Sequence, residues 1–99
     1  MNENCTHKMK NKKRSEEDIK KLNSRINRII GQLNGISKMF EENRYCGDIL
    51  IQLNASISAL KKIEEIVLKE HINTCVVEDL KQEKYETVDE LIKLIEGIK

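Results

Sequence analysis

Two short segments, Arg44-Tyr45-Cys46-Gly47-Asp48 and His71-Ile72-Asn73-Thr74-Cys75, enclose the stretch that decides the fold. No proline and no glycine lie between Gly47 and Cys75. Apolar side chains recur between them at helical spacing, at Ile49, Leu50, Leu53, Ile57, Leu60, Ile63 and Val67. The pattern predicts one long helix that carries Cys46 at its start and both His71 and Cys75 at its end.

The length of this helix separates three side chains that are typical metal ligands. At about 1.5 Å of rise per residue, the path from Cys46 to His71 covers roughly 37 Å. His71 and Cys75 are four residues apart, so they lie on one face of a helix and are able to bind the same ion. Cys46 lies at a helix N-terminus, where the helix dipole favours a thiolate, the form of cysteine that binds metals.

A second copy of the chain removes the separation. If two such helices pack antiparallel, Cys46 of one chain meets His71 and Cys75 of the other, and two equivalent sites arise about a two-fold axis. Two thiolates and one imidazole form a three-coordinate set that suits Cu(I), whereas a structural zinc site takes four ligands. Cys5 and His7, near the N-terminus, are candidate extra ligands.

Composition favours a single all-α domain. The chain has 99 residues, of which 35% are charged and 38% hydrophobic, with neither proline nor tryptophan. Ser15 followed by Asp18 predicts an N-cap, and an apolar heptad pattern predicts a first helix over about residues 16–43. We expect the second helix to run to about residue 74, a connector over residues 76–86, and a short third helix capped by Thr87 with Glu90. A hairpin of this size buries little apolar surface alone, so oligomerisation is expected.

Charge is distributed unevenly along the chain. Residues 1–28 contain nine basic and four acidic side chains, whereas residues 29–99 contain nine basic and thirteen acidic ones. The basic N-terminal third indicates a polyanionic partner, and the alternative interpretation is a solvated basic tail. We predict a disordered basic tail over residues 1–14 and a helical domain over residues 15–99.

Several classes of protein are disfavoured. No signal peptide or transmembrane run is apparent, so the chain is expected to be cytoplasmic, where cysteines are more often ligands or redox-active thiols than structural disulfides. No paired carboxylates, nucleophilic triad or phosphate-binding loop is present, so an enzyme with a small-molecule substrate is not expected.

Four sequence segments together are typical of a known family. They are Arg25-Ile26-Asn27-Arg28-Ile29 followed by Gly31-Gln32-Leu33-Asn34-Gly35-Ile36, then Tyr45-Cys46 with Asp48-Ile49-Leu50, then Gln52-Leu53 with Ala55 and Ala59-Leu60, and finally His71 with Thr74-Cys75. Over about residues 15–96 the chain resembles the all-helical metal-sensing transcriptional repressors of the CsoR/RcnR family. The resemblance implies a three-helix protomer, with two long antiparallel helices and a short C-terminal helix, that forms an antiparallel homodimer and a dimer-of-dimers homotetramer.

The resemblance also implies a function. Cys46, His71 and Cys75 match the ligands of the copper-sensing branch, and Tyr45 and Glu90 match outer-shell residues that couple metal to DNA. Members of this branch bind operator DNA in the apo state and are released when Cu(I) binds, which derepresses copper efflux and homeostasis genes.

DNA contacts are implied on the basic faces of the first two helices, without a helix-turn-helix. Arg25 and Lys62 match family contact positions, and the neighbouring basic residues Lys21, Arg28 and Lys61 are expected to add phosphate contacts. Two positions depart from the family: Ile30 replaces a residue that is usually charged, and Lys62 replaces a frequent Arg, which weakens bidentate phosphate binding.

Three alternatives stay open. Cys46 and Cys75 are able to form an inter-chain disulfide or polysulfide bridge, which would make the protein a persulfide or thiol-redox sensor. Participation of Cys5 and His7 would favour nickel or zinc. A cytosolic copper buffer or chaperone would need no DNA binding, and the basic N-terminal third argues against it.

Overall fold

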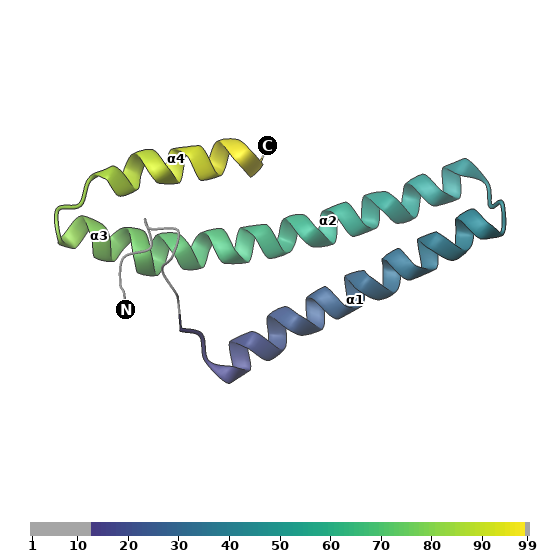
Figure 1. The fold of residues 1–99 in the computed structure, drawn as a ribbon, viewed down its shortest axis with the longest axis horizontal. Helices are drawn as coiled ribbons and strands as arrows, with labels where there is room; N and C mark the ends of the chain where they lie inside the picture. Colours follow the sequence, from purple (N-terminus) through teal and green to yellow (C-terminus); the bar gives the residue numbers. More distant parts are fainter. Residues whose placement is uncertain (1–12, 99) are drawn as a thin grey trace. The chain divides into compact units, whose positions relative to one another are not determined.

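All the regular structure in the described residues is helical, as predicted. The computed structural model describes residues 13–98 (Figure 1). Its elements are α1 (Glu16–Glu41), α2 (Cys46–Glu70), the π-helix η1 (His71–Val76), α3 (Val77–Lys81) and α4 (Glu86–Ile98). The chain forms two compact units, one from Ser15 to Ile63 and another that contains Arg14 and the residues from Glu64 onward.

Helix α1 begins as the sequence predicts. Ser15 has extended backbone angles and its hydroxyl oxygen accepts a hydrogen bond from the Asp18 backbone N–H at 3.0 Å. Three acidic residues, Glu16, Glu17 and Asp18, occupy the first turn, where they complement the positive end of the helix dipole. The first helix therefore has a defined start that depends on local chemistry alone.

The turn between α1 and α2 follows Glu41, two residues before the predicted end. Asn43 has a φ of 54°, in the left-handed region that asparagine tolerates better than most residues. The Tyr45 carbonyl then accepts the backbone N–H groups of Asp48 and Ile49, which starts α2 at Cys46. The Tyr45 ring lies against Gly47, where an added Cβ would come within 2.5 Å of the ring.

Only part of the predicted heptad seam of α1 is buried. Ile29 and Ile36 are 4% and 3% exposed, and Ile49 of α2 is also buried. The alternate seam positions are exposed, namely Ile19, Ile26, Leu33 and Phe40. Between α1 and α2, the buried Ser56 hydroxyl donates to Gln32 Oε1 at 3.2 Å. The seam thus has two faces, of which one packs within this unit and the other stays uncovered in the single chain.

Helix α2 likewise exposes apolar side chains. Leu50, Ile51, Ile57 and Leu60 are all exposed, although they belong to the long apolar stretch. These side chains form an apolar surface that the oligomer expected from the sequence would cover. Within residues 13–98, no helix has the length and hydropathy that a membrane span requires.

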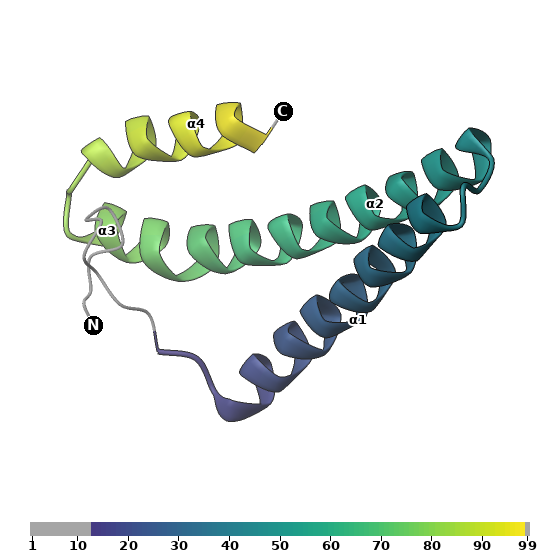
Figure 2. The ribbon, with the colours of Figure 1, turned by 45° about the vertical axis from the view of Figure 1, so that its right-hand side comes forward.

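The predicted connector over residues 76–86 was wrong in its extent. Helical structure continues through η1 and α3 to Lys81, so only residues 82–85 join α3 to α4 (Figure 2). Residues 76–81 contain no glycine or proline, and nothing in their backbone chemistry ends a helix. The helix stops where Glu83 adopts a φ of 60°.

The start of α4 also differs from the prediction. Thr87 was expected to be the N-cap, but α4 begins one residue earlier, at Glu86. The Thr87 side chain is fully buried and its hydroxyl has no hydrogen-bond partner, so it forms no capping box with Glu90. Helix α4 instead contacts η1, the segment that contains His71 and Cys75.

The Ser15 cap should stabilise the fold measurably. Ser15→Ala removes the acceptor for the Asp18 N–H and should lower the free energy of unfolding by about 1 kcal/mol. Ser15→Asp, which keeps a side-chain acceptor, should retain most of the stability. Urea denaturation followed by circular dichroism measures both; equal stability of the Ala and wild-type proteins would contradict a capping role.

Candidate metal centre

Cys46 provides an accessible thiol. It is the first residue of α2, and its side chain is a free, exposed cysteine. The preceding Tyr45 is 75% exposed. The thiol is therefore open to solvent and to ligands from another chain, next to an aromatic ring on the same turn.

His71 and Cys75 lie together on the π-helix η1. Four residues make slightly less than one π-helical turn, so this spacing puts the two residues on one face of η1. The His71 Nε2 atom is buried and has no hydrogen-bond partner in the described structure, and Cys75 is 6% exposed. A buried nitrogen without a partner costs free energy unless something binds it.

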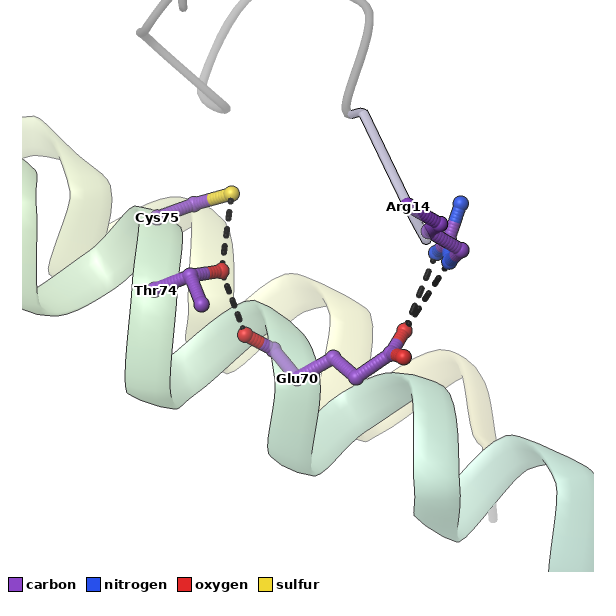
Figure 3. A network of polar contacts seen from close by, with 4 residues as sticks. All are labelled: Arg14, Glu70, Thr74 and Cys75. Carbon is purple, nitrogen blue, oxygen red and sulfur yellow. Dashed lines mark hydrogen bonds and ion pairs between the residues drawn. The ribbon is translucent and has the colours of Figure 1, made fainter. Parts of the chain in front are cut away.

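Thr74 explains why the helix widens at this point. Its hydroxyl donates to the Glu70 carbonyl oxygen at 2.6 Å and competes with the regular backbone N–H donor for that acceptor (Figure 3). π-Helical turns of this kind occur frequently at functional sites. The same hydroxyl lies 3.5 Å from the Cys75 Sγ. Cys75 is disulfide-bonded in this structure, so it would have to be reduced before its sulfur could serve as a thiolate ligand.

The predicted ligands fit a soft metal ion, but one chain does not assemble them. The unpartnered His71 Nε2 and the sulfurs of Cys46 and Cys75 are suitable donors for Cu(I). Among residues 13–98, no three His, Cys, Asp or Glu side chains gather closely enough to hold an ion. His71 and Cys75 both lie on η1, whereas Cys46 is the first residue of α2. Cys5 and His7 lie outside the described residues.

The two predicted outer-shell residues differ in their surroundings. Glu90 is half-buried on α4, the helix that contacts η1. Tyr45 is exposed beside Cys46 at the start of α2. Glu90 is therefore on an element adjacent to the histidine and the second cysteine, while Tyr45 accompanies the first cysteine.

The predicted DNA-binding residues are accessible. Lys21, Arg25 and Arg28 follow one another at helical spacing on α1, with Arg25 half-buried and the others exposed. Lys61 and Lys62 are exposed on α2. Ile30 is also exposed, at 49%, which fits a position usually occupied by a charged residue.

Asp79 is a buried residue of this segment that was not predicted from the sequence. Its side chain is completely buried, and neither carboxylate oxygen has a hydrogen-bond partner. The signal was present in the spacing, because Asp79 follows Cys75 by four residues and thus extends the face that begins at His71. A buried carboxylate without partners is costly.

A polar network at the end of α2 was likewise not predicted from the sequence. Arg14, which precedes the Ser15 cap, donates through Nε and Nη2 to Glu70 Oε1 at 3.2 and 3.1 Å (Figure 3). The Glu70 carbonyl oxygen accepts the Thr74 hydroxyl that contacts Cys75. No local pattern predicts a pairing across 56 residues.

The comparison with known sequences gives consistent matches. A family model described as metal-sensitive transcriptional repressor matches residues 4–97. The copper-sensing transcriptional repressor CsoR of Bacillus subtilis (strain 168) is 38% identical over 81 residues, which cover 82% of this chain and 79% of the relative. The copper-sensing transcriptional repressor RicR of Mycobacterium tuberculosis is 44% identical over 52 residues, which cover 52% of this chain and 54% of the relative.

Solved structures match the fold as well. The crystal structure of the copper-sensing repressor CsoR with Cu(I) from Geobacillus thermodenitrificans NG80-2 superposes with a TM-score of 0.82 at 36% identity, covering 88% of this chain and 92% of the other. The nickel-responsive transcriptional regulator InrS superposes with a TM-score of 0.73 at 31% identity, covering 87% of this chain and 98% of the other.

Asp79 should reduce the stability of the reduced, metal-free protein. Asp79→Asn removes a buried carboxylate that has no partner, and we expect the free energy of unfolding to rise by about 1–3 kcal/mol. Asp89→Asn, on an exposed position of α4, is the matched control and should change it by less than about 0.5 kcal/mol. Urea denaturation compares the two, and a destabilised Asp79→Asn protein would mean that the carboxylate is stabilised by its surroundings.

Proposed function

The chain belongs to the family of metal-sensitive transcriptional repressors, and from this premise we propose that it is a Cu(I)-responsive repressor of copper efflux and homeostasis genes. Membership indicates a role in transcription, with DNA as the partner, rather than catalysis. In the proposed cycle the apo protein binds operator DNA in the cytoplasm and Cu(I) releases it.

The choice of Cu(I) rests on the donor atoms of the candidate site, which are one imidazole nitrogen and two sulfurs. His71 has a buried, unpartnered Nε2 one turn from the Cys75 sulfur, and Cys46 is a free thiol. Sulfur and imidazole at low coordination number suit Cu(I). Relatives named as copper-sensing repressors support this choice, and the nickel-responsive regulator is the less similar of the two structural matches described above.

The site requires a second copy of the chain. We propose that Cys46 of one copy joins His71 and Cys75 of another, in a homodimer whose α2 helices run antiparallel, and that two dimers form a homotetramer. The exposed apolar residues of α2, including Leu50, Ile57 and Leu60, are the surface that such packing would cover. Bound Cu(I) would link the two chains through its bonds to these three donors and would have no other chemical role.

The His71 imidazole is also proposed to connect the metal to the residues around the site. With Nε2 on the metal, the Nδ1–H of His71 is free to donate to an outer partner. Glu90 is the proposed partner because it lies on α4, which contacts η1, and Tyr45, which directly precedes Cys46, is proposed to act in the same way. These residues would carry the change at the site to the rest of the dimer.

DNA binding is assigned to basic side chains. Lys21, Arg25 and Arg28 on α1, with Lys61 and Lys62 on α2, are proposed to contact phosphates, so the affinity should fall steeply with salt. Cu(I) is able to shift the protein from DNA only as far as it binds the released conformation more tightly than the bound one.

A thiol-redox sensor is the second candidate function. Cys75 is disulfide-bonded, and a sulfur that forms a disulfide is able to respond to oxidants or persulfides. Cys46, the partner expected for Cys75 from the sequence, is a free thiol, so the inter-chain bridge stays a proposal. The repressor and its DNA contacts would be unchanged, and only the signal would differ. Mass spectrometry after persulfide treatment, run beside a Cu(I) competition titration, separates these two signals.

Loss of either cysteine ligand should abolish tight copper binding. For Cys46→Ala and Cys75→Ala we expect Cu(I) affinity to fall by more than about 100-fold, since even outer-shell partners contribute 10- to 100-fold. A competition titration of the fully reduced protein against a Cu(I) chelator measures this. Size-exclusion chromatography and gel shifts without copper should stay normal, and tight Cu(I) binding by either variant would disprove the assigned site.

His71 should matter more for signalling than for affinity. His71→Ala leaves both sulfur ligands, so it should retain part of the Cu(I) affinity while losing most of the copper-induced release from DNA. Fluorescence anisotropy with labelled DNA, with and without Cu(I), measures the release. A His71→Ala protein that copper still releases fully would exclude this role.

A further inference from the structure

The ion pair between Arg14 and Glu70 differs from others in the described residues. It joins residues 56 positions apart, with both side chains partly buried at 28% and 24% exposure. Three ion pairs elsewhere in residues 13–98 join close neighbours in sequence, namely Glu17 with Lys21, Glu42 with Arg44, and Glu65 with Lys69. An arginine that donates two hydrogen bonds to a carboxylate in a partly buried site is less available to bind another anion.

Arg14 is a candidate DNA contact in its own right. It belongs to the basic N-terminal third and lies next to the Ser15 cap of α1, the helix that contains Lys21, Arg25 and Arg28. A guanidinium binds a carboxylate and a phosphate through the same planar arrangement of donors. While Arg14 donates to Glu70, those donors are not available to a phosphate.

Glu70 is also linked to the metal-binding segment. It is the last residue of α2 and directly precedes His71, and its carbonyl oxygen accepts the Thr74 hydroxyl beside Cys75 (Figure 3). Whatever fixes the η1 turn therefore also fixes the backbone that positions the Glu70 carboxylate.

We infer that Glu70 is an internal competitor of the DNA phosphate for Arg14. This rests on the proposed function and adds a residue pair to it. Arg14 contacts a DNA phosphate when it is released from Glu70, and the ion pair with the Glu70 carboxylate otherwise keeps Arg14 from the DNA. Ligand binding at His71 and Cys75 favours the withheld state by ordering η1. By linkage, DNA that binds Arg14 opposes ligand binding to the same extent.

The first test needs neither metal nor DNA. Trypsin cleaves after Arg14 only when the guanidinium enters the protease, so Glu70→Gln should accelerate appearance of the fragment beginning at Ser15 by at least about threefold. Glu64→Gln removes the same charge from an exposed position on α2 and is the matched control. Mass spectrometry compares this fragment with the one produced by cleavage after Lys13. Equal rates for the two variants would overturn the inference.

The second test measures DNA. Because phosphate contacts carry no sequence information, a labelled random duplex of about 30 bp serves as the probe over roughly 50–200 mM salt. Glu70→Gln should bind on the order of three- to fivefold more tightly than Glu64→Gln. Its slope of log affinity against log salt should be steeper by about one phosphate contact. Arg14→Gln in the Glu70→Gln background should remove both gains.

The outcomes separate the two proposals. Faster cleavage with unchanged DNA affinity would mean that Arg14 is withheld but does not contact DNA, which overturns the competition. If the tighter DNA binding of Glu70→Gln persists in the Arg14→Gln background, it comes from the lost charge of Glu70 alone, which also overturns the competition. A wild-type protein that binds no duplex at low salt would refute the proposed function, whatever the trypsin experiment finds, and the competition with it.

Discussion

The length of α2 is the constraint on which the rest of the structure depends. A helix of 25 residues is roughly 37 Å long, and it has Cys46 as its first residue and His71 directly after its last. A helix cannot fold back on itself to join its ends. A site that needs donors from both ends must therefore be completed by another molecule, and the many exposed apolar side chains of α2 suit that role.

The segment that follows α2 concentrates unusual chemistry in nine residues. A π-helical turn, a buried nitrogen on His71 without a partner, and a completely buried Asp79 occur together there. Each costs free energy, and together they oppose the stability that the apolar residues of η1 and α4 provide. Such local conflicts are expected where binding, rather than folding alone, has determined the residues.

Features that depend on neighbouring residues were predictable from the sequence. Ser15 capping α1 and Cys46 starting α2 both follow from short motifs beside a helical apolar pattern. The continuation of the helix to Lys81 was missed although residues 76–81 contain neither glycine nor proline, because their mixed and charged sequence lacks the regular apolar spacing that marks the longer helices. The prediction that Thr87 caps α4 was wrong, because the same sequence motif also fits a residue inside the first turn of a helix.

Of the candidate site, the sharing of one face by His71 and Cys75 followed from their spacing, while its completion by Cys46 stays a prediction. Arg14 and Glu70 were out of reach, since nothing local links residues so far apart in the chain.

The π-helical turn has a consequence for how this segment tolerates changes in length. A π turn holds about one residue more than an α turn, so η1 sets the phase of every side chain that follows it. Deleting one residue between His71 and Cys75 would therefore restore regular α-helical geometry and leave α3 in nearly the same rotational phase relative to α2. Asp79 would keep its place on the helix face, and His71 and Cys75, then three residues apart, would still share a face. The segment is accordingly expected to accept the loss of one residue, whereas the same deletion within the regular turns of α2 would rotate everything that follows by about 100°.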